Sequence, residues 1–164
     1  MSARCFFFYG TLMDPQILRA VLRRNVDSRR LRPAILPGFR RVFHRTASYP
    51  VLVADAAAEV GGVLAAGMTL RDAQLLSAYE GPDYRLAHLP VRTLPASAPV
   101  TAGVFLPLQD AAASTIGWSY AAWRRKHRDR FLRQVRRGQH APVATRRSRP
   151  AVTAPPDDPG CSGG

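Results

Sequence analysis

Cysteine is scarce in this chain of 164 residues, which contains only two. Cys5 lies in an apolar run, whereas Cys161 lies in a terminal stretch rich in glycine, serine and proline. These different surroundings argue against a disulfide, and a chain without a disulfide framework is typical of a reducing compartment. We therefore expect a cytoplasmic protein that is stabilised by a hydrophobic core, for which 46% hydrophobic residues suffice.

Long apolar runs and known cofactor motifs are also missing. The apolar run at residues 5–9 is too short for a secretory leader, and no stretch approaches the length of a membrane span. The sequence contains no P-loop, no dinucleotide fingerprint and no Gly-x-Ser-x-Gly motif. The histidines lack the spacing of metal ligands; they are His44, His88, His127 and His140. We expect no membrane segment, no metal and no cofactor.

Acidic residues are few, so the net charge is strongly positive. Lysine is also scarce, so nearly all of the positive charge comes from arginine. The formal net charge is +13, and Lys126 is the single lysine among 24 basic residues. The densest basic cluster runs through residues 124–149. One interpretation is a GC-rich genome, whose codons place arginine wherever a cation is tolerated. The other is contact with nucleic acid or another polyanion through this cluster, and both stay open.

Apolar runs and turn residues alternate in the first half of the chain. Residues 4–9 form a continuous apolar and aromatic run, which predicts a buried central strand. Asp14 followed by Pro15 predicts the start of a helix that ends near residues 24–25. Two prolines and a glycine at residues 33–38 predict an irregular segment. We expect the next strands at residues 39–44, 51–54 and 59–69.

The second half begins with a clear helix signal. Thr69 and Asp72 have the spacing of a capping box, and Gly81 should end the helix that they open. The remaining predicted elements are strands at residues 84–94 and 100–106 and a helix at residues 118–137. About six strands and three helices, with strands mostly following strands, predict an α+β domain with a bent or barrel-like sheet.

One domain accounts for most of the chain. We place it at residues 1–138, where the apolar residues are concentrated. Residues 139–164 are rich in proline, arginine, serine and glycine and have almost no large apolar residue. Such a composition predicts a basic, disordered tail.

The first candidate site is the junction between the first strand and the first helix. It comprises Tyr9, Gly10, Thr11 and Leu12. A glycine allows a sharp turn there and leaves backbone N–H groups free near a helix N-terminus, an arrangement that suits a carboxylate. Any strand–turn–helix junction has these features, so the loop does not identify a site by itself.

The second candidate is Glu80, one of only two glutamates; the other is Glu59. Ala73, Leu76 and Glu80 share one face of the predicted helix. If that face is buried, both burial and the helix dipole raise the pKa of Glu80. A raised pKa suits a general acid/base that works near neutral pH. The alternative is a solvated carboxylate beside an arginine.

Several short motifs occur together in an order that resembles one known family. They are Phe-Phe-Tyr-Gly-Thr-Leu at residues 7–12, Leu-Pro-Gly-Phe-Arg at 36–40, Tyr-Pro at 49–50, Leu-Ser-Ala-Tyr-Glu-Gly at 76–81 and Asp-Tyr-Arg at 83–85. The chain is similar over residues 4–132 to the γ-glutamylcyclotransferase-like (AIG2-like) family. The resemblance is to its short branch, which includes γ-glutamylamine cyclotransferases.

The resemblance implies a small mixed β-barrel flanked by helices and an enzyme of the lyase or acyltransferase type. The implied substrate is a small γ-glutamyl amide, with 5-oxoproline as product and without metal or cofactor. Glu80 would be the catalytic acid/base. The substrate-binding residues would be Tyr9, Gly10, Thr11, Leu12, Tyr49 and Tyr84. Thr11 stands where glutathione-directed branches usually carry serine, so glutathione is a less favoured substrate.

Two alternatives come from other classes of protein. The same fold could be a catalytically silent module that binds a small carboxylate or a protein. The basic C-terminal helix and tail could instead contact nucleic acid. The sequence favours no particular oligomeric state and no particular leaving amine.

Overall fold

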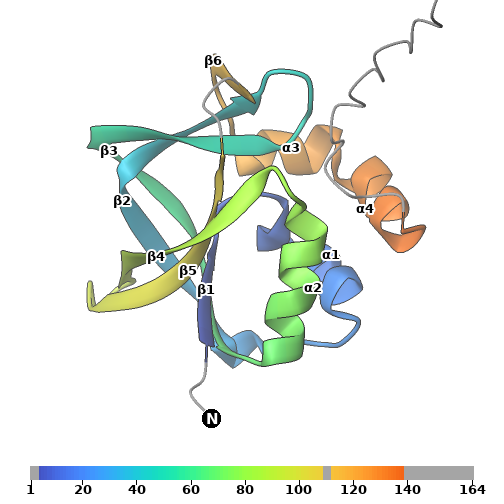
Figure 1. The fold of residues 1–164 in the computed structure, drawn as a ribbon, viewed down its shortest axis with the longest axis horizontal. Helices are drawn as coiled ribbons and strands as arrows, with labels where there is room; N and C mark the ends of the chain where they lie inside the picture. The colour runs from blue at the N-terminus through green and yellow to red at the C-terminus, as the bar shows by residue number, and fades with distance from the viewer. Residues whose placement is uncertain (1–3, 109–111, 139–164) are drawn as a thin grey trace, which may run out of the picture.

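Six strands form one sheet, and five of them close into a barrel (Figure 1). The computed structural model describes residues 4–108 and 112–138, and every count of helices and strands refers to these residues. The predicted tail at residues 139–164 lies outside them. The strands are β1 (Arg4–Phe8), β2 (Leu31–His44), β3 (Pro50–Met68), β4 (Tyr84–Thr93), β5 (Pro99–Pro107) and β6 (Ala113–Gly117).

The ring follows the order β3-β1-β5-β4-β2, and a further pairing of β2 with β3 closes it. β6 pairs with β2 outside the ring. β1 and β5 are parallel, whereas the other pairs within the ring are antiparallel. The predicted α+β fold with a small mixed barrel is therefore confirmed.

Helices cover one side of the barrel (Figure 1). They are α1 (Pro15–Leu22), α2 (Leu70–Glu80), α3 (Tyr120–Lys126) and α4 (Arg128–Arg136), with short 3₁₀ turns η1 (Thr11–Met13) and η2 (Ser28–Arg30). α1 contacts both α2 and α4. Within the described part of the chain, none of the helices has the length and apolar character needed to cross a bilayer.

β1 is the strand that joins the two hydrophobic cores. Phe6 and Phe8 face the helices and pack in one core with residues such as Leu76. Phe7 points to the opposite face and packs inside the barrel with residues such as Val104. Burial on both faces explains the continuous apolar run at the start of the sequence and confirms the predicted central strand.

The predicted helix starts are confirmed. The Asp14 carboxylate accepts hydrogen bonds from the backbone N–H groups of Gln16 and Ile17, and Pro15 is the first residue of α1. α1 ends slightly earlier than predicted, because Arg23 already has a left-handed conformation with φ 56°. At α2 the Thr69–Asp72 capping box is present, and Gly81, with φ 79°, ends the helix.

The predicted breaks in the long hairpin are wrong. β2 runs through the segment at residues 33–38, and β3 replaces the two strands predicted at 51–54 and 59–69. The two strands pair from Leu31 opposite Ala65 to Phe43 opposite Pro50. A shift in register beside Gly38, which has φ 85°, accommodates the irregular sequence as a bulge. Pairing across the hairpin thus outweighs local propensity.

The prediction of one helix at residues 118–137 is also wrong, since the helix breaks at His127. This residue has φ −126° and ψ −19°. In a straight helix, eight residues would place the Cα atoms of Trp123 and Phe131 about 12 Å apart along the axis. Their ring centroids lie only 5.4 Å apart, edge to face, so the break lets both rings enter the same core. The strand β6 was not predicted from the sequence.

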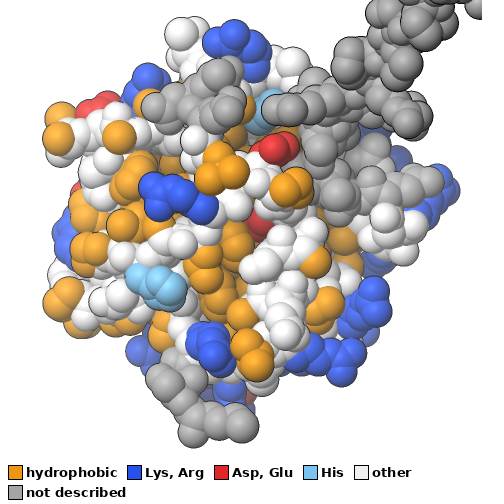
Figure 2. Space-filling view, viewed as in Figure 1, with side chains coloured by type: hydrophobic (Ala, Val, Ile, Leu, Met, Phe, Trp, Pro, Cys, Tyr) orange, Lys and Arg blue, Asp and Glu red, His pale blue; other side chains and the backbone are white. Residues whose placement is uncertain are grey.

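Basic side chains are concentrated on the helical side. Residues 15–24 and 120–137 contain eleven arginines and lysines but one aspartate. Most of these cations are exposed, and Figure 2 shows basic side chains along the right-hand margin, over α1 and α4. A groove between α1, α2 and α4 lies within this basic surface and is lined by residues that include Arg19, Arg23, Arg24 and Arg136.

Candidate functional site

A pocket opens where the end of β1, the end of α2 and the start of β3 meet. It is a small cavity of about 40 Å³ that opens to solvent. All seven predicted site residues line it: Tyr9, Gly10, Thr11, Leu12, Tyr49, Glu80 and Tyr84. The remaining lining residues are Phe7, Phe8, Pro50, Tyr79, Phe105 and Phe131. The wall is therefore mostly aromatic, with a single carboxylate.

The loop after β1 forms one wall of the pocket. A Cβ atom at Gly10 would lie 2.9 Å from Cγ of Pro50, which is too close for two carbon atoms, so the approach of the two segments requires glycine. Within the described residues, no hydrogen bond uses the backbone N–H of Gly10. This donor is therefore available to an oxygen atom of a ligand.

Side-chain hydrogen bonds hold the loop in place. The Tyr9 hydroxyl donates to the carbonyl oxygen of Phe105 at 2.7 Å, which ties the loop to β5. The hydroxyl groups of Thr11 and Tyr79 are 2.8 Å apart, which ties it to α2. Leu12 is buried in the core beneath the helices. These contacts connect the loop to β5, to α2 and to the core beneath the helices.

Glu80 is the last residue of α2 and lines the pocket with partial exposure to solvent. Burial of its carboxyl group raises the pKa to about 8. Within the described residues, none of the ion pairs includes Glu80, so no cation offsets the effect of burial. The carboxyl group can thus accept or donate a proton near neutral pH.

Four tyrosines surround this carboxyl group: Tyr9, Tyr49, Tyr79 and Tyr84. Burial raises the pKa of each phenol, and the negative charge of Glu80 raises it further in all four. The phenols therefore remain protonated at neutral pH. The Tyr9 hydroxyl donates to Phe105 and the Tyr79 hydroxyl is paired with Thr11, whereas those of Tyr49 and Tyr84 can donate hydrogen bonds to a ligand. They supply polar groups to the pocket without adding charge.

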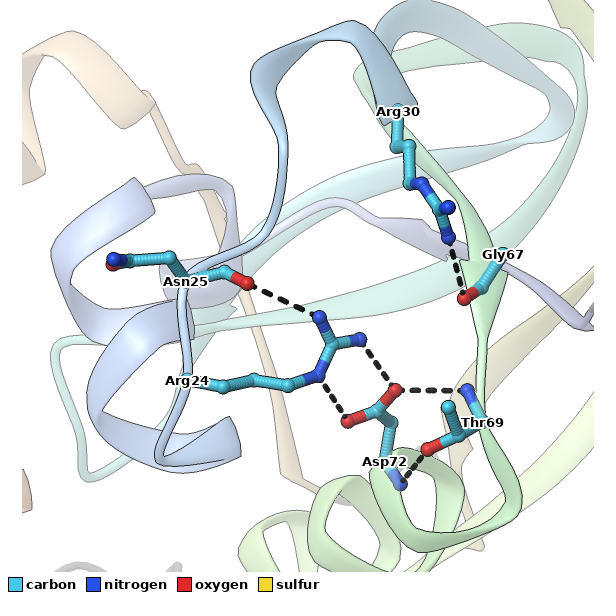
Figure 3. A network of polar contacts seen from close by, with 6 residues as sticks. All are labelled: Arg24, Asn25, Arg30, Gly67, Thr69 and Asp72. Atoms are coloured by element: carbon cyan, nitrogen blue, oxygen red, sulfur yellow. Dashed lines mark hydrogen bonds and ion pairs between the residues drawn. The ribbon is translucent and has the colours of Figure 1, made fainter.

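The opposite end of α2 is anchored by a polar network (Figure 3). The Arg24 guanidinium donates to both carboxylate oxygens of Asp72, at 2.9 and 2.6 Å. Asp72 also accepts from the backbone N–H of Thr69 at 2.8 Å. These contacts hold the pKa of Asp72 down at about 2, mainly through the hydrogen bond from Arg24. Because a helix is stiff, an anchor at its first turn helps to fix Glu80 at its last.

A second buried ion pair connects the C-terminal helix to the start of α1. Nε of Arg128 donates to Oδ2 of Asp14 at 2.6 Å, and Asp14 is almost completely buried. Phe131, one turn further along α4, reaches the pocket wall. α4 therefore contributes directly to the site.

The predicted site did not include Tyr79, Phe131, Phe105 or Pro50. Tyr79 precedes Glu80 and belongs to the motif at residues 76–81, which is a usable signal. Phe131 lies on an apolar stripe that looks like ordinary helix packing, so its sequence offers no sign of a pocket. Among the described residues, no group of three or more histidine, cysteine, aspartate or glutamate side chains could hold a metal.

Known proteins resemble this chain in sequence and in fold. A family model described as gamma-glutamyl cyclotransferase, AIG2-like, matches residues 6–125. The chain is similar to AIG2-like protein A of Arabidopsis thaliana, with 27% identity over 127 residues that cover 77% of this chain and 75% of the relative.

Two solved structures have a similar fold. One is a solution structure of an Arabidopsis thaliana protein, with a TM-score of 0.65 and 23% identity over 84% of this chain and 82% of the other. The other bears the name gamma-glutamyl cyclotransferase, with a TM-score of 0.57 and 16% identity over 66% of this chain and 68% of the other. At these identities the likeness supports the barrel fold alone.

Proposed function

Because the chain belongs to the gamma-glutamyl cyclotransferase, AIG2-like family, we propose that it releases 5-oxoproline from a γ-glutamyl amide. The observation that carries this proposal is Glu80, whose pKa burial raises to about 8, in the same pocket as a loop with a free backbone donor. In such a site the backbone N–H groups can bind a carboxylate, and the carboxyl group of Glu80 can transfer protons.

The reaction needs no external nucleophile. The α-amine of the glutamyl group attacks its own γ-carbonyl carbon, which forms the C–N bond of a five-membered lactam. The bond from that carbon to the leaving nitrogen then breaks. The α-ammonium nitrogen loses two protons before it becomes the lactam N–H. The Glu80 carboxylate takes each proton in turn and passes it to the leaving nitrogen, which departs as an ammonium group, so the balance requires no water. Holding the folded conformer can contribute about 7–11 kcal/mol in well-oriented cases.

The pocket residues divide this work. The backbone N–H groups of the loop at residues 10–12 bind the α-carboxylate and orient the glutamyl group. The hydroxyl groups of Tyr49 and Tyr84 bind polar atoms nearer Glu80. Since Glu80 must be ionised to take the first proton, turnover should increase as the pH rises towards 8 and then level off.

The test is 5-oxoproline release from a panel of γ-glutamyl amides that differ in the leaving amine. We expect wild-type protein to form product and Glu80→Gln to lose at least about 100-fold in kcat, since acid/base catalysis contributes roughly 10²–10⁴-fold. Glutamine retains the shape of the side chain, so thermal unfolding should still show a folded protein.

Glu59→Gln is the matched control. Glu59 lies on the surface, where it pairs with Arg92 at 2.6 Å, and it is not part of the pocket lining. Its loss should leave turnover close to wild type. Full activity of Glu80→Gln would refute the mechanism. If the wild type binds γ-glutamyl amides but forms no product, the catalytically silent binding module is the better account.

A further inference from the structure

Arg41 lies on β2 beside the pocket, but it is not part of the lining. One of its Nη atoms donates to the carbonyl oxygen of Tyr9 at 2.7 Å and to that of Gly61 at 3.1 Å. The guanidinium carbon lies 4.9 Å from the centroid of the Trp118 ring, within range of a cation–π contact. Arg41 is therefore held by carbonyl groups and an indole ring.

Arg41 is an unfavourable residue for the stability of the fold at this position. Burial lowers the pKa of Arg41, and its Nε has no hydrogen-bond partner among the described residues. None of the ion pairs in the described ranges includes Arg41. A partly buried cation without a carboxylate lowers stability, and an apolar side chain of similar volume would avoid that cost. The contacts of Arg41 thus point to a role other than stability.

The geometry of one peptide unit supplies that role. The carbonyl group of Tyr9 and the N–H of Gly10 belong to the same peptide, which is trans. In a trans peptide the C=O and N–H bonds point in opposite directions. A Tyr9 oxygen held by Arg41 therefore turns the Gly10 N–H away from Arg41. Gly10 lines the pocket, and its N–H has no hydrogen-bond partner among the described residues.

Trp118 extends this arrangement to a second wall of the pocket. Its indole N–H donates to the carbonyl oxygen of Ser48 at 2.8 Å. Ser48 directly precedes Tyr49 and Pro50, which line the pocket. The backbone N–H of Trp118 donates to the carbonyl oxygen of Arg41 at 3.2 Å. Arg41 and Trp118 together link the loop after β1 to the turn before β3.

We propose that Arg41 is a positioning residue, which aims the Gly10 N–H at the carboxylate of the glutamyl group through the Tyr9 carbonyl. This inference rests on the proposed function, because it concerns the same pocket. Arg41 itself does not touch the substrate. Its charge also polarises the peptide between Tyr9 and Gly10, which makes the N–H a stronger donor.

The test compares Arg41→Met, Arg41→Lys and a matched control, Arg40→Met. Arg40 is the preceding residue on the same strand, is exposed and forms an ion pair with Asp55 at 3.8 Å. Because a hydrogen bond to a charged group is lost, we expect Arg41→Met to raise KM about tenfold to hundredfold. We expect kcat to change less than about threefold, since Glu80 is untouched, and the pH profile to stay the same.

A second readout does not depend on turnover. Titration of 5-oxoproline into ¹⁵N-labelled protein should shift the Gly10 amide signal in the wild type and in Arg40→Met. This response should be lost in Arg41→Met and weakened in Arg41→Lys, which keeps the charge but loses the planar guanidinium. Arg41→Lys carries the test if Arg41→Met does not fold.

An unchanged KM together with an unchanged Gly10 response in both Arg41 variants overturns the assignment. A fall in kcat with a shifted pH profile overturns it too, because that result makes Arg41 part of the proton transfer. If the wild type makes no product, the proposed function fails and the Gly10 titration alone decides. Binding that is lost in Arg41→Met then supports the positioning role, whereas binding that persists, or is absent from the wild type, overturns it.

Discussion

A carboxyl group that holds its proton more tightly in the folded chain than in the unfolded chain makes stability depend on pH. Glu80 is such a group, since burial raises its pKa from 4.5 to about 8. Below pH 4.5 it is protonated in both states and has no effect. Between these two values the unfolded chain has lost the proton that the folded chain retains, so the free energy of unfolding decreases as the pH rises.

We therefore expect Glu80→Gln to become more stable relative to wild type as the pH rises from 5 to 8. The gain should be on the order of a few kcal/mol. Urea unfolding of both proteins across this range would measure it. If both proteins showed the same pH dependence, Glu80 would ionise as it does in water, and the basis for acid/base chemistry would be removed.

Two of the site's main parts could be predicted from local sequence. The loop at residues 9–12 follows an apolar strand and precedes a capped helix, and Glu80 shares a helix face with Leu76. Both signals act over a few residues. The hydrogen bond between Thr11 and Tyr79 joins residues 68 positions apart, and no local pattern reveals such a contact. The hydrogen bond from Arg41 to the carbonyl oxygen of Tyr9, 32 positions away, was missed for the same reason.

At the scale of single elements, α2 depends on its first turn. Asp72 is 2% exposed and accepts hydrogen bonds from Arg24 and Thr69 (Figure 3). Asp72→Asn keeps the shape but removes the charge. We expect the free energy of unfolding at neutral pH to fall by about 2–3 kcal/mol, because Arg24 loses its ionic partner. Urea unfolding measures this loss.

The exposed pair between Glu59 and Arg92 gives the reference value. Glu59→Gln should change the free energy of unfolding by less than about 1 kcal/mol, as is usual for surface ion pairs.

The stabilisation by Asp72 depends on pH. Its pKa is lowered to about 2, so the stabilisation is complete above 3.8 and disappears as the pH falls through 2. Equal losses in both variants would contradict the anchoring role of Asp72.

Helix boundaries were easier to predict than strand boundaries. The caps of α1 and α2 are set by side chains next to the helix, such as Asp14 and Thr69, and both starts were predicted correctly. The continuity of β3 depends on its partners β1 and β2, which lie elsewhere in the sequence. The break at His127 follows from the packing of Trp123 against Phe131, and the regular spacing of apolar residues along this segment concealed it.

At the scale of the whole molecule, the densest positive charge lies away from the pocket lining. Eleven of the basic side chains lie on or next to α1, α3 and α4, whereas no arginine or lysine among the described residues lines the pocket. A polyanion could therefore bind the helical side without entering the pocket. The groove between α1, α2 and α4 provides arginines on neighbouring elements for such a contact.

We expect a fluorescent single-stranded oligonucleotide to bind the full chain with an affinity that falls steeply as salt increases. Fluorescence anisotropy at several salt concentrations measures this dependence. Deletion of residues 139–164 and the combined change of Arg19, Arg23 and Arg136 to Gln should each weaken binding, while 5-oxoproline release stays unchanged. If the affinity depended neither on salt, nor on the deletion, nor on the three substitutions, a GC-rich genome would be the better explanation of the arginines.

The pocket is assembled from the two ends of the described chain. Phe7 on β1 and Phe131 on α4 both line it, and β1 is paired with β5 through Phe6 and Gly103. During synthesis, a nascent chain that has emerged only as far as β5 lacks part of the wall. Such a chain cannot complete the site, however well its early hairpin has formed. Ligand binding would therefore report on synthesis and folding to the last helix, and a truncated product would be recognised by its failure to bind.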